Sequence, residues 1–213
     1  MKAFSMKPNR TGGYLFTFCG LDGCGKTTML TRLKEELAPR YTVFLTKQPT
    51  NAVRESAVFR TYMDSPDHSA FDYRSLSLSA AGDRLQHGSK VIEPELEAGH
   101  IVLSDRYWYS CLANLRARGF EKDRWIYEVA ESAVRPDIAF FFDVPVETAV
   151  KRVRSREAEK DRYIDMALQY RLRDEYRAIC KANHGVWIPT DIPPKDSFAM
   201  VKKNVERVLK HEN

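Results

Sequence analysis

The chain has 213 residues, of which 43% are hydrophobic and 30% charged, and its formal net charge is +5. These values exclude a wholly disordered chain and favour one globular domain, which we place at residues 13–213. The longest apolar run is far shorter than the ~20 residues of a membrane-spanning helix. The basic balance fits a polyanionic partner: a nucleic acid, a membrane surface or a phosphorylated small molecule. Residues 1–12 lack the apolar segment of a secretory signal and predict a flexible tail.

Apolar runs and amphipathic segments alternate along the rest of the chain. Runs rich in β-branched and aromatic residues predict five strands, at residues 14–19, 41–46, 101–105, 138–144 and, more weakly, 185–189. Apolar residues at helical spacing predict helices at residues 27–37, 89–98, 124–134 and 197–209, with a turn or kink at Pro94. Nearly continuous apolar runs are typical of parallel strands covered on both faces. The alternation therefore predicts an α/β fold with right-handed crossovers.

A glycine-rich loop follows the first predicted strand. Residues 20–28, GLDGCGKTT, match the phosphate-binding pattern GxxxxGK[ST], and they stand between a strand and a helix as the pattern requires. The loop amides and the positive end of the helix would surround phosphate oxygens. We expect Lys26 to reach the β- and γ-phosphates of ATP and the Thr27 hydroxyl to bind Mg²⁺. The predicted ATP-binding residues are Gly20, Gly23, Cys24, Gly25, Lys26, Thr27 and Thr28.

Further cationic residues narrow the class of phosphate-binding protein. The sequence has no NKxD motif, which a GTPase would need for base recognition, and the chain is short for a motor or a helicase. A kinase holds two anions that repel each other, so it needs positive groups from several segments. Lys26, Lys47, Arg84 and Arg106 are candidates for these groups, together with the arginines of a charged run at 151–162. That run predicts either an exposed helix or a mobile segment.

Four motifs, in this order, resemble those of the thymidylate kinase family, a branch of the nucleoside monophosphate kinases. They are the loop GLDGCGKTT, DRLQHGSKVIEPEL at 83–96, SDRYWYS at 104–110 and FDVPVETAVKRVRSR at 142–156. The resemblance covers nearly the whole chain. It implies the three-layer α/β/α fold of P-loop NTPases, with a five-stranded parallel sheet, helices on both faces and a short helical lid at about residues 151–164.

The resemblance also implies roles for individual residues. Asp22 would accept a hydrogen bond from the sugar 3′-hydroxyl of the acceptor, Arg84 would contact the base edge and Arg106 would clamp the acceptor phosphate. Asp105 would act on Mg²⁺ through water, beside Thr27. The lid arginines that would close over the transferring phosphoryl group are Arg152, Arg154, Arg156 and Arg162. The substrate-binding residues are then Asp22, Lys47, Arg84, Arg106, Tyr107, Ser110 and Asn114, and the catalytic residues are Lys26, Arg106, Arg152, Arg154 and Arg156.

Three departures from the family pattern lie in the expected acceptor site. Ala80 stands where the family has a phenylalanine that stacks on thymine, and Asn114 stands where it has an aromatic residue. In the segment that resembles TREPG, Lys47 keeps the cation but not the bidentate geometry of arginine, and Gln48 loses the carboxylate. Either another aromatic residue fills the pocket or the acceptor is not dTMP. The candidate rings are Phe71, Tyr73, Tyr107 and Tyr109.

The predicted reaction is Mg²⁺-dependent transfer of the ATP γ-phosphoryl group to a nucleoside monophosphate, with dTMP as the favoured acceptor and dTDP as the product. The alternatives are a kinase for another nucleotide or a nucleoside, and a nucleic-acid-linked P-loop ATPase. Seven arginines between residues 152 and 177 favour a clamp around small phosphates, so neither a nucleic acid nor a membrane is the expected partner. Cysteines without a CxxC pair are typical of the cytoplasm, and the resemblance implies a homodimer.

Overall fold

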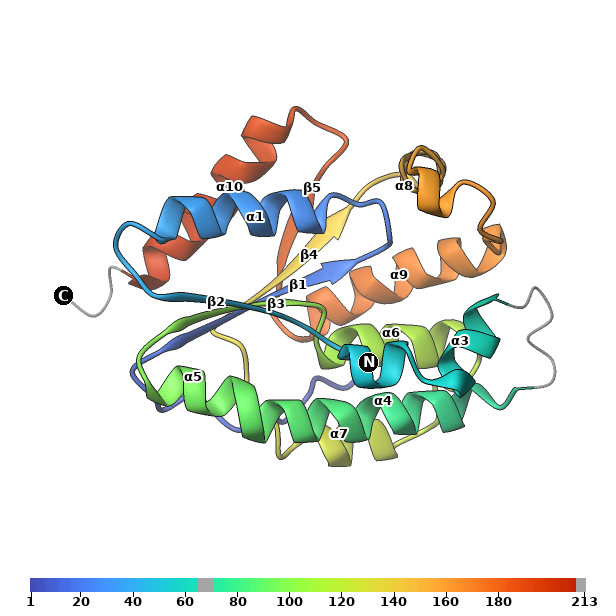
Figure 1. Cartoon of the computed structure of the whole chain (residues 1–213), viewed down its shortest axis with the longest axis horizontal. Helices are drawn as coiled ribbons and strands as arrows, with labels where there is room; N and C mark the ends of the chain where they lie inside the picture. The colour runs from blue at the N-terminus through green and yellow to red at the C-terminus, as the bar shows by residue number, and fades with distance from the viewer. Residues whose placement is uncertain (65–70, 210–213) are drawn as a thin grey trace.

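The computed structural model describes residues 1–64 and 71–209, and a parallel sheet of five strands lies at its centre (Figure 1). The strands are β1 (Tyr14–Gly20), β2 (Val43–Lys47), β3 (Ile101–Asp105), β4 (Ile138–Asp143) and β5 (Val186–Pro189). Their order across the sheet is β2-β3-β1-β4-β5, and all neighbouring pairs are parallel. The predicted five-stranded α/β fold is therefore confirmed.

Helices cover both faces of the sheet and complete the three-layer arrangement (Figure 1). One face carries α1 (Lys26–Leu37) and α10 (Pro194–Leu209). The other carries α4 (Tyr73–His87), α5 (Glu93–Glu97), α6 (Trp108–Ala117), α7 (Trp125–Ala130) and α9 (Met166–Ala182). Because both faces are covered, the inner strands β1, β3 and β4 are almost wholly buried, whereas the edge strand β2 is partly exposed. This burial explains the continuous apolar sequences of the inner strands.

The strand order creates a ligand site at the carboxyl edge of the sheet. Strands β1 and β3 are neighbours, but α1 follows β1 on one face and α6 follows β3 on the other (Figure 1). The two connecting loops therefore separate, and open α/β sheets bind ligands at such a point. One of these loops is the glycine-rich loop and the other begins at Asp105. The topology thus brings together two motifs that are far apart in the sequence.

The predicted helix at 89–98 is the end of a longer helical segment. Helix α4, a π-helical turn at Gly88–Ile92 and α5 follow one another without interruption. The ring of Pro94 cannot donate a backbone hydrogen bond, and in a regular helix it clashes with the carbonyl four residues earlier. The wider π-helical turn accommodates this ring, since the Glu93 N–H bonds to the Gly88 carbonyl, five residues back. The sequence predicted a turn or kink at this place.

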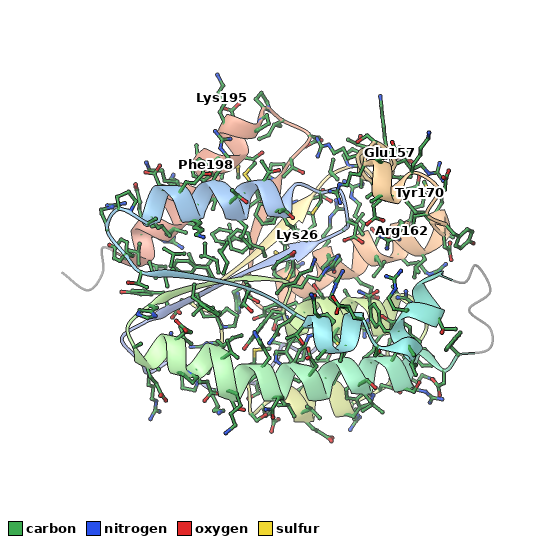
Figure 2. All side chains as sticks on the ribbon, in the orientation of Figure 1. Lys26, Glu157, Arg162, Tyr170, Lys195 and Phe198 are labelled. Atoms are coloured by element: carbon green, nitrogen blue, oxygen red, sulfur yellow. The ribbon has the colours of Figure 1, made fainter. Side chains whose placement is uncertain are left out.

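The lid consists of a helix, a short turn and irregular chain. Helix α8 (Val146–Arg154) buries one apolar face, and a 3₁₀ turn (Glu157–Glu159) follows it before α9 begins (Figure 2). The charged run at 151–162 thus forms the last turn of α8 and the segment beyond it, and most of its side chains are exposed. Of the two interpretations that the sequence allowed, an exposed helix holds for its first residues.

Residues 1–12 lie against the domain. The ring of Phe4 packs against Tyr109 and Tyr127, with centroid distances of 5.6 and 5.2 Å. The Lys7 N–H donates to the Ala133 carbonyl at 2.9 Å, which attaches the segment to the chain just before β4. The expectation of a flexible tail does not match these contacts. Aromatic packing and backbone pairing hold the segment in place, and its polar composition gave no sign of them.

Two further helices connect β2 to α4. They are α2 (Asn51–Arg54) and α3 (Ala57–Asp64), and the sequence did not predict either of them. Thr50 caps α2 through its side chain, which accepts from the Ala52 N–H at 3.3 Å. Within residues 1–64 and 71–209, no helix is both long and apolar enough to cross a membrane.

Candidate active site

The loop between β1 and α1 has the backbone geometry that phosphate binding requires. Gly23 and Gly25 have φ values of 82° and 89°, in the left-handed region that other residues rarely adopt. A Cβ atom on Gly23 would lie 2.2 Å from the carbonyl oxygen of Ala149 in α8, so the close approach of loop and lid helix requires glycine. Gly25 is the N-cap of α1, and the next residues, Lys26, Thr27 and Thr28, line the cavity described below. The positive end of α1 therefore points to this cavity.

A cavity of about 300 Å³ lies between the glycine-rich loop, the ends of β2 and β3, helices α2, α3, α4 and α6, and the lid with α9. It brings together 14 of the predicted site residues: Gly20, Asp22, Gly23, Gly25, Lys26, Thr27, Thr28, Lys47, Arg84, Asp105, Arg106, Ser110, Asn114 and Arg156. The cationic residues in its lining are Lys26, Lys47, Arg54, Arg84, Arg106, Arg118, Arg156 and Arg162. Among the described residues these eight face two carboxylates, so the cavity suits a polyanionic ligand.

Lys26 is the first residue of α1, and its side chain extends back into the glycine-rich loop (Figure 2). The residue is 6% exposed, and its Nζ donates to the carbonyl oxygens of Gly20 at 3.1 Å and Leu21 at 2.7 Å. These bonds hold the ammonium inside the loop, where the motif predicts contact with phosphate. Lys26 thus combines a fixed position with a charge at the wall of the cavity.

Asp22 joins the loop to arginines from two other segments. It forms an ion pair with Arg106, which follows β3, and its second oxygen lies 3.4 Å from Nη2 of Arg162 in the lid (Figure 2). Desolvation opposes the charged form of Asp22, but the positive charges of Arg106, Lys26 and Arg162 outweigh it and hold its pKa well below the usual value. Asp22 is therefore an ionised acceptor at neutral pH.

Arg106 and Tyr107 point to opposite sides of the chain. Arg106 has a φ of 69°, which is rare for a residue with a side chain, and its N–H donates to the Phe18 carbonyl at 2.8 Å. This turn directs its guanidinium to the glycine-rich loop and sends Tyr107 into the core. Tyr107 is 1% exposed, and its hydroxyl donates to the Val134 carbonyl at 2.8 Å. The prediction that Tyr107 binds substrate disagrees with this placement, because its side chain does not line the cavity.

The end of the cavity formed by α4 and α6 combines a buried cation with aromatic rings. Arg84 is 3% exposed; its Nη1 donates to the Ala80 carbonyl at 2.9 Å, while its Nε has no hydrogen-bond partner in the described structure. Tyr73, two helical turns before Ala80 in α4, also lines the cavity, with the Arg118 guanidinium 3.9 Å from its ring centroid. The other candidate rings, Phe71, Tyr107 and Tyr109, do not line the cavity. Of the four candidate rings for the base pocket, Tyr73 is therefore the one that the structure supports.

Asn114 positions Arg118 at this end of the cavity. Its side-chain amide donates to the Ser110 carbonyl at 2.9 Å, and its Oδ1 accepts from Arg118 Nη1 at 2.8 Å. Nε of Arg118 donates to the Tyr62 hydroxyl at 3.1 Å. Where the family pattern has an aromatic residue, this chain therefore has a polar one that orients a guanidinium over the Tyr73 ring.

Asp105 keeps one carboxylate oxygen without a protein partner. Its Oδ2 lies 3.6 Å from the Lys47 ammonium, whereas its Oδ1 is buried and has no hydrogen-bond partner in the described structure. Burial lowers the pKa of Lys47, and the Asp105 charge opposes that effect. Within the described ranges, no group of three or more His, Cys, Asp or Glu side chains could hold a metal ion by itself.

Three further predicted residues lie outside the cavity. Cys24 is fully buried behind the loop, and its carbonyl accepts from the Thr190 hydroxyl at 2.9 Å. Arg152 braces the loop from outside, because its Nη2 donates to the Thr190 carbonyl at 2.9 Å and its Nη1 to the Gly23 carbonyl at 3.5 Å. Arg154 is exposed, since the neighbouring Val153 occupies the buried face of α8. Of the predicted catalytic lid residues, Arg156 lines the cavity.

The cavity also contains residues that the sequence analysis did not assign to the site. Those with a charged or aromatic side chain are Arg54, Phe59, Tyr62, Arg118 and Tyr176. Arg54 is on α2, and Phe59 and Tyr62 are on α3. The spacing of Val58, Phe59 and Tyr62 is that of one helix face, and this signal could have indicated α3.

The parallel sheet, the glycine-rich loop and the cation-lined cavity define a P-loop nucleotide-binding protein of the kinase class. The sequence model of the family "Thymidylate kinase" matches residues 18–200. The chain therefore belongs to the thymidylate kinase family, as its four motifs predicted.

Similar proteins cover most of the chain. The chain is 32% identical over 205 residues to the probable thymidylate kinase of Pyrococcus horikoshii, and the aligned region covers 94% of this chain and 97% of that protein. It is 37% identical over 163 residues to the probable thymidylate kinase of Thermococcus kodakarensis, with coverage of 74% and 79%. The identity to the thymidylate kinase of a Geobacillus species is 31% over 197 residues, with coverage of 88% and 93%.

Proposed function

We propose that the protein transfers the γ-phosphoryl group of ATP to dTMP and produces ADP and dTDP. One observation carries this proposal: a single cavity has the phosphate-binding loop at one end and the buried Arg84 beside the Tyr73 ring at the other. Arg106 lines the same cavity and forms an ion pair with Asp22. The names of the relatives support dTMP as the acceptor.

Positioning and charge neutralisation account for the catalysis, because the acceptor phosphate is already anionic at pH 7 and needs no general base. We assign Lys26 to the transferring phosphoryl group and Arg106 to the acceptor phosphate. Asp22 orients Arg106 and accepts a hydrogen bond from the sugar hydroxyl. Among the lid arginines we assign Arg156 and Arg162 to the phosphoryl group, because both line the cavity.

Mg²⁺ fits the residues at the end of β3 and the start of α1. This ion usually binds through one or two carboxylates, substrate phosphates and water rather than through a complete set of protein ligands. Asp105 supplies a buried carboxylate oxygen without a protein partner, and Thr27 supplies a hydroxyl at the first turn of α1. Bound there, the ion would neutralise charge on the β- and γ-phosphates.

Two further properties belong to the proposal. We propose a homodimer, on the basis of the family resemblance, and a cytoplasmic location. The second is supported by the four cysteines, which are buried free thiols.

A coupled assay with ATP, Mg²⁺ and a panel of acceptors tests the reaction. We expect dTMP to have the highest kcat/KM among dTMP, dUMP, dCMP, dAMP, dGMP and thymidine. Turnover of thymidine without turnover of any monophosphate would contradict the proposal. So would ATP hydrolysis that nucleic acid stimulates in the absence of acceptor phosphorylation.

Restoring the ring of the family pattern tests the base pocket. We expect Ala80→Phe to lower the KM for dTMP by roughly tenfold, because stacking of a base on an aromatic side chain contributes about 1–3 kcal/mol. Steady-state kinetics with dTMP varied at saturating ATP provides the measurement. The KM for ATP serves as the internal control, since Ala80 lies on α4, away from the glycine-rich loop. A raised KM for dTMP would show that the pocket is shaped for another acceptor.

A further inference from the structure

His87, the last residue of α4, connects this helix to the end of the edge strand β2. Its Nε2 lies 2.8 Å from the Thr46 hydroxyl, and its Nδ1 lies 3.1 Å from Nε2 of Gln48. His87 is half-buried, whereas Gln48 is fully buried. One imidazole ring therefore binds the two residues on either side of Lys47.

These two contacts determine the direction in which Lys47 points. Successive side chains of an extended strand alternate between its two sides. Thr46 and Gln48 both reach the His87 ring, so Lys47 between them points away from α4. There it lines the cavity, and its ammonium lies 3.6 Å from Asp105 Oδ2. His87 does not line the cavity itself, so it acts on the site through these neighbours.

The last turns of α4 make two further contacts with the same segment. Nε2 of Gln48 lies 3.5 Å from the Arg84 carbonyl, and the Thr50 N–H donates to Asp83 Oδ2 at 2.7 Å. Arg84 is also the buried cation of the cavity. One end of α4 thus fixes the buried cation and the chain that follows β2 relative to each other.

The contacts of His87 require a neutral ring with its proton on Nε2. The Gln48 amide donates to Nδ1, so Nδ1 is an acceptor and the Nε2–H donates to the Thr46 hydroxyl. A second proton, on Nδ1, would face the amide N–H groups of Gln48. The amide would then have to rotate, and its N–H would leave the Arg84 carbonyl.

Burial favours this neutral form. It lowers the pKa of His87, and the Asp83 carboxylate, one turn earlier in α4, opposes the change. Two cations are close to the ring in β2 and α4. Lys47 points away from it, and the Arg84 guanidinium bonds to a carbonyl four residues earlier in the helix. A carboxylate at position 48, as in the family pattern, would instead stabilise a charged ring, so Gln48 matches a neutral His87.

We propose that His87 is a positioning residue of the acceptor site: in its neutral form it holds Thr46 and Gln48 and so directs Lys47 into the cavity. The proposal rests on the proposed function, because it assigns Lys47 to the acceptor nucleotide. Protonation of His87 then weakens acceptor binding, although the ring does not touch the acceptor.

Calorimetry with dTMP at pH values from about 5 to 8 tests this role without turnover. We expect the wild-type affinity to fall by roughly five- to tenfold below about pH 6.5, the ordinary histidine value, which corresponds to the loss of about one hydrogen bond. His87→Ala should show this loss already at neutral pH. His87→Gln can donate and accept without titrating, so at neutral pH it should bind dTMP within about twofold of the wild type.

The acid dependence separates positioning from a merely structural role. The phosphate of dTMP also titrates near pH 6, so the dependence that remains in His87→Gln belongs to the ligand. Gln48→Glu places a carboxylate beside the ring, and a charged ring can then donate from both nitrogens, so dTMP affinity should be kept on acidification. His100→Gln is the matched control, because His100 pairs with Glu95 just before β3, at the end of the strand away from the cavity, and should leave the wild-type profile unchanged.

Nitrogen NMR of the histidine rings gives an independent readout, with the His87 signal assigned by its loss in His87→Gln. We expect the Nε2–H form at neutral pH. A ring protonated on Nδ1 at neutral pH would overturn the proposal, and so would identical acid profiles of dTMP binding in the wild type and His87→Gln. If the wild-type protein binds dTMP but does not phosphorylate it, the proposed reaction is wrong, and these binding measurements still decide the role of His87.

Discussion

Lys26→Ala is expected to reduce kcat by roughly 10²-fold or more, because it removes charge stabilisation that acts chiefly in the transition state. The ammonium lies inside the loop, bonded to the Gly20 and Leu21 carbonyls, so its position is already set before phosphoryl transfer. An interaction made chiefly in the transition state lowers kcat and kcat/KM together. Initial rates at saturating ATP and dTMP, followed by a titration of each substrate, provide both values.

Two companion variants separate the charge from its packing. Lys26→Met keeps most of the side-chain volume and should lose as much activity as Lys26→Ala. Lys34→Ala removes an exposed lysine from the same helix and should behave like the wild type. Turnover near the wild-type value in both Lys26 variants would contradict the assignment of the nucleotide site.

Gly23→Ala is expected to weaken ATP binding by roughly 100-fold, about 3 kcal/mol, since the loop must give up two or more of its phosphate contacts. The added Cβ would lie 2.2 Å from the Ala149 carbonyl oxygen, and the φ of 82° is unfavourable for alanine. The Cβ atom is fixed to the loop backbone and its neighbour is a backbone oxygen of α8, so the loop or α8 has to move. We expect a higher KM for ATP and a free energy of unfolding lower by about 1–3 kcal/mol.

Gly82→Ala is the matched control for this substitution. Gly82 lies in α4, and a Cβ atom there would have no neighbour within 4 Å. Alanine is favoured over glycine in a helix by about 1 kcal/mol, so this variant should be slightly more stable and fully active. If Gly23→Ala bound ATP as tightly as Gly82→Ala, the close contact between loop and lid helix would not limit nucleotide binding.

The sheet and the glycine-rich loop could be predicted because local patterns encode them. Each inner strand is covered on both faces, which leaves a continuous apolar run in the sequence. The loop depends on glycine at defined positions and on Lys26, and these form a contiguous motif. Both features can therefore be predicted from a short stretch of sequence, without knowledge of the tertiary contacts.

Whether a side chain points into the cavity or away from it was harder to predict. Arg106 and Tyr107 are neighbours in one motif, but the left-handed turn at Arg106 separates their side chains. Arg152 and Arg154 belong to the charged run of the lid, and packing of α8 against the loop directs both away from the cavity. These orientations come from tertiary contacts, which the order of residues in a motif does not contain.

Arg54 shows a different limit of prediction from sequence. Helix α2 has four residues, too few for a periodic pattern, and it exists because Thr50 caps it and Asp83 anchors it. Asp83 lies 33 positions further along the chain. Residues placed by such long-range anchors enter a site without any local signal.

The excess of cations in the cavity has a consequence for the stability of the whole protein. Among the residues that the structure describes, eight positive side chains surround two carboxylates; they repel one another in the folded chain, and unfolding separates them. Nucleotides that bind the folded form relieve this repulsion and shift the folding equilibrium towards it, in proportion to RT ln(1 + [L]/Kd). The phosphates of the bound substrates therefore neutralise the excess positive charge of the cavity. We therefore expect saturating nucleotide to raise the free energy of unfolding by that amount.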